Sequence, residues 1–125
     1  MPWFAAHVIM SVRFKDGNQD TYPVWENIIL IEAPTDKEAW HKAQLRAKED
    51  EGDSQGTFRW GGRPATWVLA GIRKLIMCDY LGAQPESGTE VTYSELELAT
   101  AEDLRKLIDG ESVDVTYVEQ ERPRA

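Results

Sequence analysis

Residues 33–51, APTDKEAWHKAQLRAKEDE, carry the clearest helix pattern in the chain, and the neighbouring segments are interpreted relative to it. Thr35 and Glu38 form a T-x-x-E capping box, in which each side chain bonds a backbone N–H group that the first helical turn leaves free. An apolar stripe follows at helical spacing and consists of Ala39, Trp40, Ala43 and Ala47. The small alanines let this helix lie close to a sheet, and Trp40 is expected to be its main buried anchor.

The segments before and after this helix alternate between apolar and polar residues, which is typical of strands with one buried face. Residues 3–15 are apolar at the even positions from Phe4 to Phe14. Residues 22–33 are apolar on both faces, so this strand is expected to lie in the centre of the sheet and to form an antiparallel hairpin with the first. Further strands are predicted at residues 57–60, 65–78, 89–99 and 112–119, with a short second helix at residues 101–109.

The order of these elements predicts a single α+β domain, residues 1–119, followed by a flexible tail at residues 120–125. We expect a mainly antiparallel sheet of about five or six strands, with one main helix and one short helix packed on one face. The N-terminal residues lack the pattern of a signal peptide or a membrane span. Together with a single cysteine, Cys78, this pattern predicts a cytoplasmic protein that needs no disulfide and binds no membrane.

The net charge of −8 argues against nucleic-acid binding, because a protein that neutralises phosphates needs a basic surface. The charge is uneven along the chain: residues 54–80 have a net charge of +3, and residues 81–121 have a net charge of −9. Two interpretations stay open. The two segments pair in the fold and partly neutralise each other, which is the expectation, or the basic segment forms a small anion-binding patch.

The stretch FRWGGRPATW, residues 58–67, is the most ligand-like part of the sequence. Aromatic rings can stack on a ligand, guanidinium groups can donate paired hydrogen bonds, and a Gly-Gly turn exposes backbone N–H groups. The candidate binding residues are Arg59, Trp60, Arg63 and Trp67, and the matching ligand would be a small anionic or aromatic molecule. The structural alternative is a hairpin in which Trp60 and Trp67 form a cross-strand aromatic pair.

A second candidate site is polar and consists of His7, Tyr93, Glu95 and Glu97. His7, with a nearby glutamate such as Glu95, could be the acid–base pair of a small enzyme. The alternatives are a hydrogen-bonded histidine on a half-exposed sheet face, and glutamates in cross-strand ion pairs with Arg13 or Arg73. Cys78 is expected to be a buried, unreactive thiol. The sequence contains no catalytic or metal-binding motif, so we predict no metal and no cofactor.

Four runs of sequence carry a family resemblance: WFAAHVIMSVRFKDGNQDTYPVWENIILIEAPTDKEAWHKA, FRWGGRPATWVLAGIRKLI, GTEVTYSELEL and AEDLRKLIDGESV. On these runs the chain resembles the bacterial family known as domain of unknown function 4288. The resemblance implies a small, soluble, cytoplasmic bacterial domain of one sheet and a helix, and it carries over no catalytic residue.

The leading prediction from the sequence is therefore a non-catalytic module that binds a ligand or another protein. One concrete version is an acidic, immunity-type protein that neutralises a basic toxin, because the chain has a strongly acidic C-terminal third. The alternative is the small enzyme that uses His7. An unpaired strand edge would also allow a homodimer.

Overall fold

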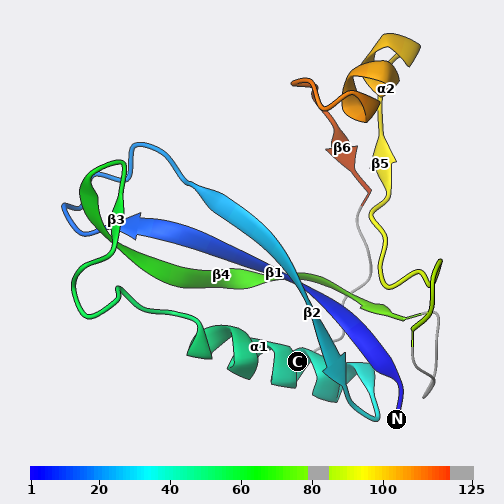
Figure 1. Ribbon diagram of the computed structural model, residues 1–125, viewed down its shortest axis with the longest axis horizontal. Helices are drawn as coiled ribbons and strands as arrows, with labels where there is room; N and C mark the ends of the chain where they lie inside the picture. Colours follow the sequence, from blue (N-terminus) through cyan, green and yellow to red (C-terminus); the bar gives the residue numbers. More distant parts are fainter. Residues whose placement is uncertain (79–84, 119–125) are drawn as a thin grey trace.

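The computed structural model describes residues 1–78 and 85–118. Within them the chain has an α+β fold made of a four-stranded antiparallel sheet, a two-stranded sheet and two helices (Figure 1). The larger sheet has the strand order β2-β1-β4-β3, and the smaller sheet pairs β5 with β6. The elements are β1 Trp3–Phe14, β2 Val24–Glu32, α1 Asp36–Glu49, β3 Arg59–Trp60, β4 Arg63–Met77, β5 Leu96–Glu97, α2 Ala101–Ile108 and β6 Thr116–Tyr117.

The central strand of the larger sheet is β1, which pairs with β2 on one side and with β4 on the other. The prediction that residues 22–33 form a central strand was wrong, because β2 lies at the edge of the sheet. The apolar residues on the second face of β2 stay about half exposed: Val24 is 52%, Ile28 is 49% and Leu30 is 46% exposed. Apolar character on both faces therefore does not mean that both faces are covered here.

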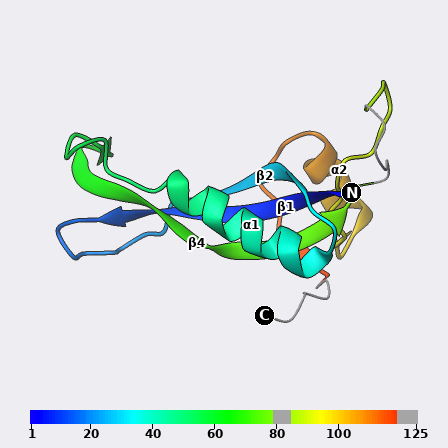
Figure 2. The same cartoon turned by 90° about the horizontal axis from the view of Figure 1, so that it is seen from below.

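The hydrophobic core lies between α1 and one face of the larger sheet (Figure 2). The even-numbered side chains of β1 are all buried, as their alternation predicted, and α1 packs against them through its alanines. Ala39, Ala43 and Ala47 are at most 2% exposed, whereas Trp40 is only partly buried at the margin of this core. The capping box is confirmed on one side, because the hydroxyl of Thr35 accepts a 3.2 Å hydrogen bond from the Glu38 N–H group.

The pairing of β4 with β1 is irregular at two positions. The register shifts between His7 and Val8 and again between Ile9 and Met10, so the pairing skips Arg73 and Ala70 on β4. Such bulges re-aim the side chains beside them. The irregular stretch lies on both sides of Gly71, and it places Lys74 directly opposite His7.

The C-terminal third contains less strand than its alternation predicted. The predicted strands at residues 89–99 and 112–119 are reduced to β5 and β6, which pair through two residues each. Helix α2 forms where expected, with the hydroxyl of Thr100 accepting a 3.0 Å hydrogen bond from the Asp103 N–H group. It lies with β5 and β6, away from the face that α1 covers, so the expected packing of both helices on one face holds for α1 alone (Figure 1). The predicted tail, residues 120–125, lies outside the described residues.

Candidate functional site

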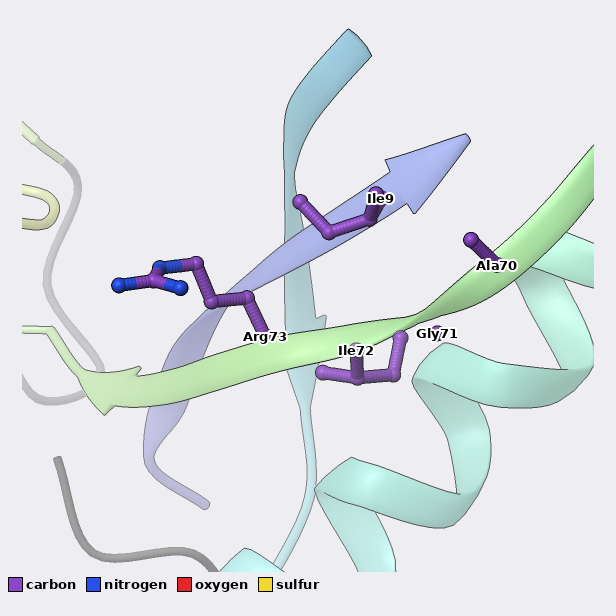
Figure 3. A pocket seen from close by; sticks show the side chains of 5 residues that line it. All are labelled: Ile9, Ala70, Gly71, Ile72 and Arg73. Atoms are coloured by element: carbon purple, nitrogen blue, oxygen red, sulfur yellow. The ribbon is translucent and has the colours of Figure 1, made fainter. Parts of the chain in front are cut away.

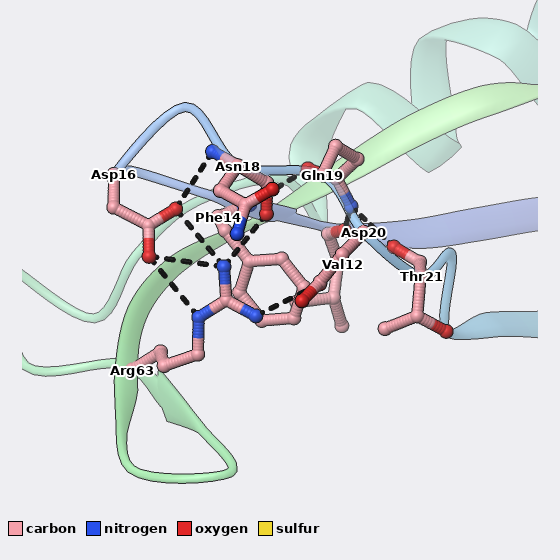
Figure 4. Close-up of polar contacts among 8 residues, drawn as sticks. All are labelled: Val12, Phe14, Asp16, Asn18, Gln19, Asp20, Thr21 and Arg63. Carbon is pink, nitrogen blue, oxygen red and sulfur yellow. Dashed lines mark hydrogen bonds and ion pairs between the residues drawn. The ribbon is translucent and has the colours of Figure 1, made fainter.

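The predicted ligand site of Arg59, Trp60, Arg63 and Trp67 lies at the end of the larger sheet where the β1–β2 turn meets the β3–β4 turn. Arg63 holds the two turns together (Figure 4). Its guanidinium donates to Asp16 at 2.9–3.1 Å, to Asp20 at 3.0 Å and to the Asn18 carbonyl at 2.7 Å, and it lies 3.7 Å from the centre of the Phe14 ring. A ligand that used Arg63 would have to displace these carboxylates.

Arg63, Asp16 and Asp20 form a charged clamp between the two turns, and their charges stabilise one another. The Asn18 N–H group and then the Arg63 guanidinium hold the pKa of Asp16 below its usual value. The carboxylates, with Asp20 first, raise the pKa of Arg63. Within the basic segment, Arg63 is neutralised by the β1–β2 turn and not by the acidic C-terminal third.

The aromatic residues of this end pack around Trp25 of β2, which the sequence analysis did not single out. Trp60 and Trp67 each meet the Trp25 ring edge-on, with ring centres 5.0 Å and 5.1 Å apart. Their predicted cross-strand pair is thus replaced by a cluster of three. Arg59 is exposed and approaches the neighbouring Phe58 carbonyl at 3.5 Å. The four predicted residues lie at one end of the sheet, and ligand binding by them stays a prediction.

A polar cluster occupies the opposite face of the larger sheet, which is turned away from α1 and is called the open face below. His7 is 1% exposed at its centre. Its Nδ1 lies 2.7 Å from a Glu26 carboxylate oxygen, and its Nε2 lies 2.5 Å from the Thr92 hydroxyl. Because a carboxylate only accepts hydrogen bonds, this geometry assigns the ring proton to Nδ1 and leaves Nε2 to accept the Thr92 O–H group.

The environment of His7 favours its neutral form. Burial is the largest effect and lowers the pKa of His7 below 6.5, and the charge of Lys74 and that of Arg73 act in the same direction. The hydrogen bond to Glu26 opposes them, because a carboxylate favours the imidazolium. The neutral ring is the form that can take up a proton.

Lys74 is the second buried polar group of the open face, at 3% exposure. Its ammonium donates to the Tyr93 carbonyl at 2.5 Å and to the Ser94 hydroxyl at 3.0 Å, and it lies 5.6 Å from the centre of the Tyr93 ring. Burial lowers the pKa of Lys74. The Cys78 thiol donates to the Val91 carbonyl at 3.3 Å, and burial raises the pKa of that thiol, in line with the unreactive cysteine predicted. Residues 91–94 are therefore bound to the sheet by side chains.

The predicted polar site is only partly assembled. Tyr93 lies beside Lys74, but the glutamate that meets His7 is Glu26 and not Glu95. Glu95 and Glu97 are exposed on β5 or next to it, and within the described residues neither forms an ion pair with an arginine. The signal for Glu26 was in the hairpin register, which pairs Ile9 with Glu26 and so places Glu26 diagonally across from His7.

Beside the polar cluster the open face is hollowed. A hollow of about 460 Å³ is lined by Ile9, Ala70, Gly71, Ile72 and Arg73. Figure 3 shows Ile9 and Arg73 on the side of β4 away from α1, whereas Ile72 points toward the helix. The Arg73 guanidinium lies 4.2 Å from the centre of the Tyr117 ring, and its Nε is buried with no hydrogen-bond partner among the described residues.

The outer edge of β2 borders the open face. The hydrogen bond from the Val12 N–H group to the Pro23 carbonyl shows which alternate residues of β2 direct their backbone groups toward β1. It follows that the backbone groups of Trp25, Asn27, Ile29 and Ile31 point toward β1, whereas those of Val24, Glu26, Ile28, Leu30 and Glu32 point outward. The Glu32 carbonyl accepts a 2.8 Å bond from Lys42, and no other described residue pairs with these outward backbone groups.

The described residues contain neither a membrane-spanning helix nor a metal-binding cluster. No helix there is both long and apolar enough to cross a membrane. In the same ranges no group of three histidine, cysteine or acidic residues could hold a metal ion.

Comparison with known proteins gives one match. The family described as "Domain of unknown function (DUF4288)" matches residues 3–94. This range contains the larger sheet, α1 and the residues 91–94 that lie against the open face, and it leaves out β5, α2 and β6. No curated protein and no solved structure matches the chain.

Proposed function

The chain belongs to the DUF4288 family, and we propose that it is a protein-binding module. The module would add a partner's strand to the outer edge of β2, a strand that lies within the matched residues 3–94. The observation that carries the proposal is the row of outward backbone groups on β2. A row of unpaired N–H and C=O groups is a template for another strand.

The β2 edge lacks three of the devices that usually block such pairing, namely proline, lysine and a β-bulge. Its sequence, VWENIILIE, contains no proline and no lysine, and its nine-residue register with β1 has no bulge. Natural monomers protect their edges with these features, because an exposed and regular apolar edge invites association. The proposal accounts for their absence, since an edge that receives a partner has to stay open.

Side chains beside this edge define the chemistry of the partner. Val24, Ile28 and Leu30 are about half exposed on the open face, so an incoming strand with alternating apolar residues would cover them. Residues 16–36 contain five carboxylates and no lysine or arginine, and Arg63, bound to Asp16 and Asp20, offsets one of these charges. The favoured partner segment is therefore extended, apolar on one face and basic, which agrees with a role in neutralising a basic protein.

A synthetic strand tests the proposal. The probe is a nine-residue peptide of alternating valine and lysine, titrated into the chain by isothermal calorimetry. Its control is the same peptide with all backbone nitrogens methylated, which keeps the charge but removes the donors of both edges. Binding of the first peptide and not of the second supports strand addition, and equal binding of both would reduce the interaction to charge attraction and refute it.

Two variants locate the binding. Ile28→Lys places a charge that repels the basic strand on β2 and should abolish binding, whereas Leu45→Lys changes an exposed leucine of α1 and should leave it intact. Light scattering at two concentrations tests whether a second copy of the chain occupies the edge instead. If the chain forms a dimer that Ile28→Lys disrupts, the edge receives a second copy, and the proposal of a basic partner protein fails.

A further inference from the structure

The open face contains a chain of three side chains that strand addition does not use. Thr92 bonds His7, and His7 bonds Glu26, in the order hydroxyl, imidazole, carboxylate. We propose that Thr92 is a nucleophile activated by His7 and positioned for the hydrolysis of a small ester that bears a second, anionic group. The inference is independent of the β2 edge, because it concerns the side chains of the open face and not the outward backbone.

The geometry meets the requirements of an activated hydroxyl. The nucleophile and its base lie within hydrogen-bond distance, 2.5 Å, and the base is oriented from its other nitrogen at 2.7 Å. Because the Nδ1 proton of His7 is donated to Glu26, the lone pair of Nε2 is directed at Thr92. His7 is buried while Thr92 is partly exposed, so a substrate can approach Thr92 but not the ring that activates it.

The bonds that hold residues 91–94 do not depend on the contact between Thr92 and His7. Lys74 binds the Tyr93 carbonyl and the Ser94 hydroxyl, and the Cys78 thiol binds the Val91 carbonyl. These contacts anchor the segment on both sides of Thr92. A valine at position 92 would keep this anchoring and remove the hydroxyl, so the role of the hydroxyl can be tested apart from folding.

The class of substrate follows from the hollow beside the cluster. Ile9 lies two positions from His7 on the same face of β1, and it lines the hollow with Arg73. Arg73 lines the hollow and forms no ion pair among the described residues, so a carboxylate in the hollow would pair with its guanidinium. The hollow is open to solvent and would hold only the anionic end of a substrate, so the favoured substrate is a half-ester of a short dicarboxylic acid.

The reaction balances with water as the only co-reactant. As the Thr92 oxygen attacks the ester carbonyl carbon, its proton passes to Nε2 of His7, and the new C–O bond gives a tetrahedral intermediate. The intermediate breaks the bond to the alkoxide, which leaves as an alcohol with the proton from Nε2. Water then attacks the acyl–Thr92 ester by the same route, His7 again transfers the proton, and the carboxylic acid is released with Thr92 restored. Glu26 is a positioning residue that holds the ring.

Covalent labelling tests the nucleophile. The probe is an alkyl fluorophosphonate incubated with the full chain, followed by intact-mass measurement and peptide mapping. The expected result is one phosphonyl group per chain on Thr92, retained in Thr92→Ser and absent in Thr92→Val. Thr116→Val, which removes an exposed threonine hydroxyl of β6, should label like the wild type. No label on the folded wild-type chain, or a label that persists in Thr92→Val, overturns the proposal.

Turnover separates catalysis from structure. The mono-p-nitrophenyl ester of succinic acid should be hydrolysed, and His7→Gln should lower kcat about 100-fold or more. Glu26→Gln should lower kcat with KM unchanged, and Arg73→Gln should raise KM for this ester but not for p-nitrophenyl acetate. If circular dichroism shows that Thr92→Val or His7→Gln is unfolded, the proposal is tested by the residue that the fluorophosphonate labels in the wild type and in Thr92→Ser. Wild-type hydrolysis no faster than in Thr92→Val at equal folding refutes the mechanism.

Discussion

Replacing Ala43 with leucine tests the contact that organises the fold. Ala43 is 0% exposed on the side of α1 that faces the larger sheet, in a stripe whose small side chains bring the helix close to the sheet. Leucine adds three carbon atoms where the packing has no room, and overpacking of this kind destabilises a protein by about 1–3 kcal/mol. For a domain of this size, 1 kcal/mol corresponds to a decrease of about 3–6 °C in Tm.

Urea unfolding of Ala43→Leu measures this effect. The midpoint should fall while the slope, which reflects the surface exposed on unfolding, stays the same. The matched control is Leu45→Ala on the exposed side of the same helix, where the leucine is 61% exposed, and its stability should stay within about 0.5 kcal/mol of the wild type. A loss below about 0.5 kcal/mol for Ala43→Leu would mean that α1 does not lie close on the sheet, and it would refute the packing described above.

Three further predictions concern the polar groups and the edge. First, because burial lowers the pKa of His7 in the folded state, the unfolded chain binds the proton more tightly, and stability should fall as the pH is lowered from 6.5 through the folded pKa. Urea unfolding at several pH values above 4 measures this decrease. His7→Gln should flatten it, and a wild-type profile flat in that range would contradict it. Second, Arg63→Ala releases the clamp between the two turns, so hydrogen exchange at residues 16–20 should accelerate and Tm should fall. Arg63→Lys should recover little of either, because an ammonium cannot reproduce the paired donors, and full recovery would show that charge alone suffices. Third, Ile28→Lys should change the free energy of unfolding by less than about 0.5 kcal/mol, because Ile28 is half exposed. A larger loss in urea unfolding would show that the open face is already covered.

Local patterns in the sequence predicted the elements that depend on neighbouring residues. The capping box at Thr35, the alanine stripe and the even-numbered face of β1 each need only their own segment to be recognised, and the structure has all three. The family resemblance was confirmed by the match over residues 3–94.

The errors came from properties that a segment does not carry by itself. The position of β2 at the edge depends on which strand pairs beyond it, and apolar residues on both of its faces did not decide that. Extended residues with alternating polarity were predicted as a strand at 89–99, but Thr92 and its neighbours reach the sheet through side-chain bonds. The contact of Glu26 with His7 needed the exact register of the hairpin. The sequence therefore predicted that the polar site pairs a histidine with a glutamate, but it did not predict that this glutamate is Glu26.

Amide-resolved hydrogen exchange of β2, with and without the valine–lysine peptide, tests the central claim most directly. In the dilute chain the outward amides of Glu26, Ile28 and Leu30 should exchange rapidly, while the inward amides of Asn27, Ile29 and Ile31 stay protected. Saturating peptide should protect the outward three and leave the inward three unchanged. Outward amides that are already protected in the dilute chain, or that stay unprotected when the peptide is bound, would contradict strand addition at β2.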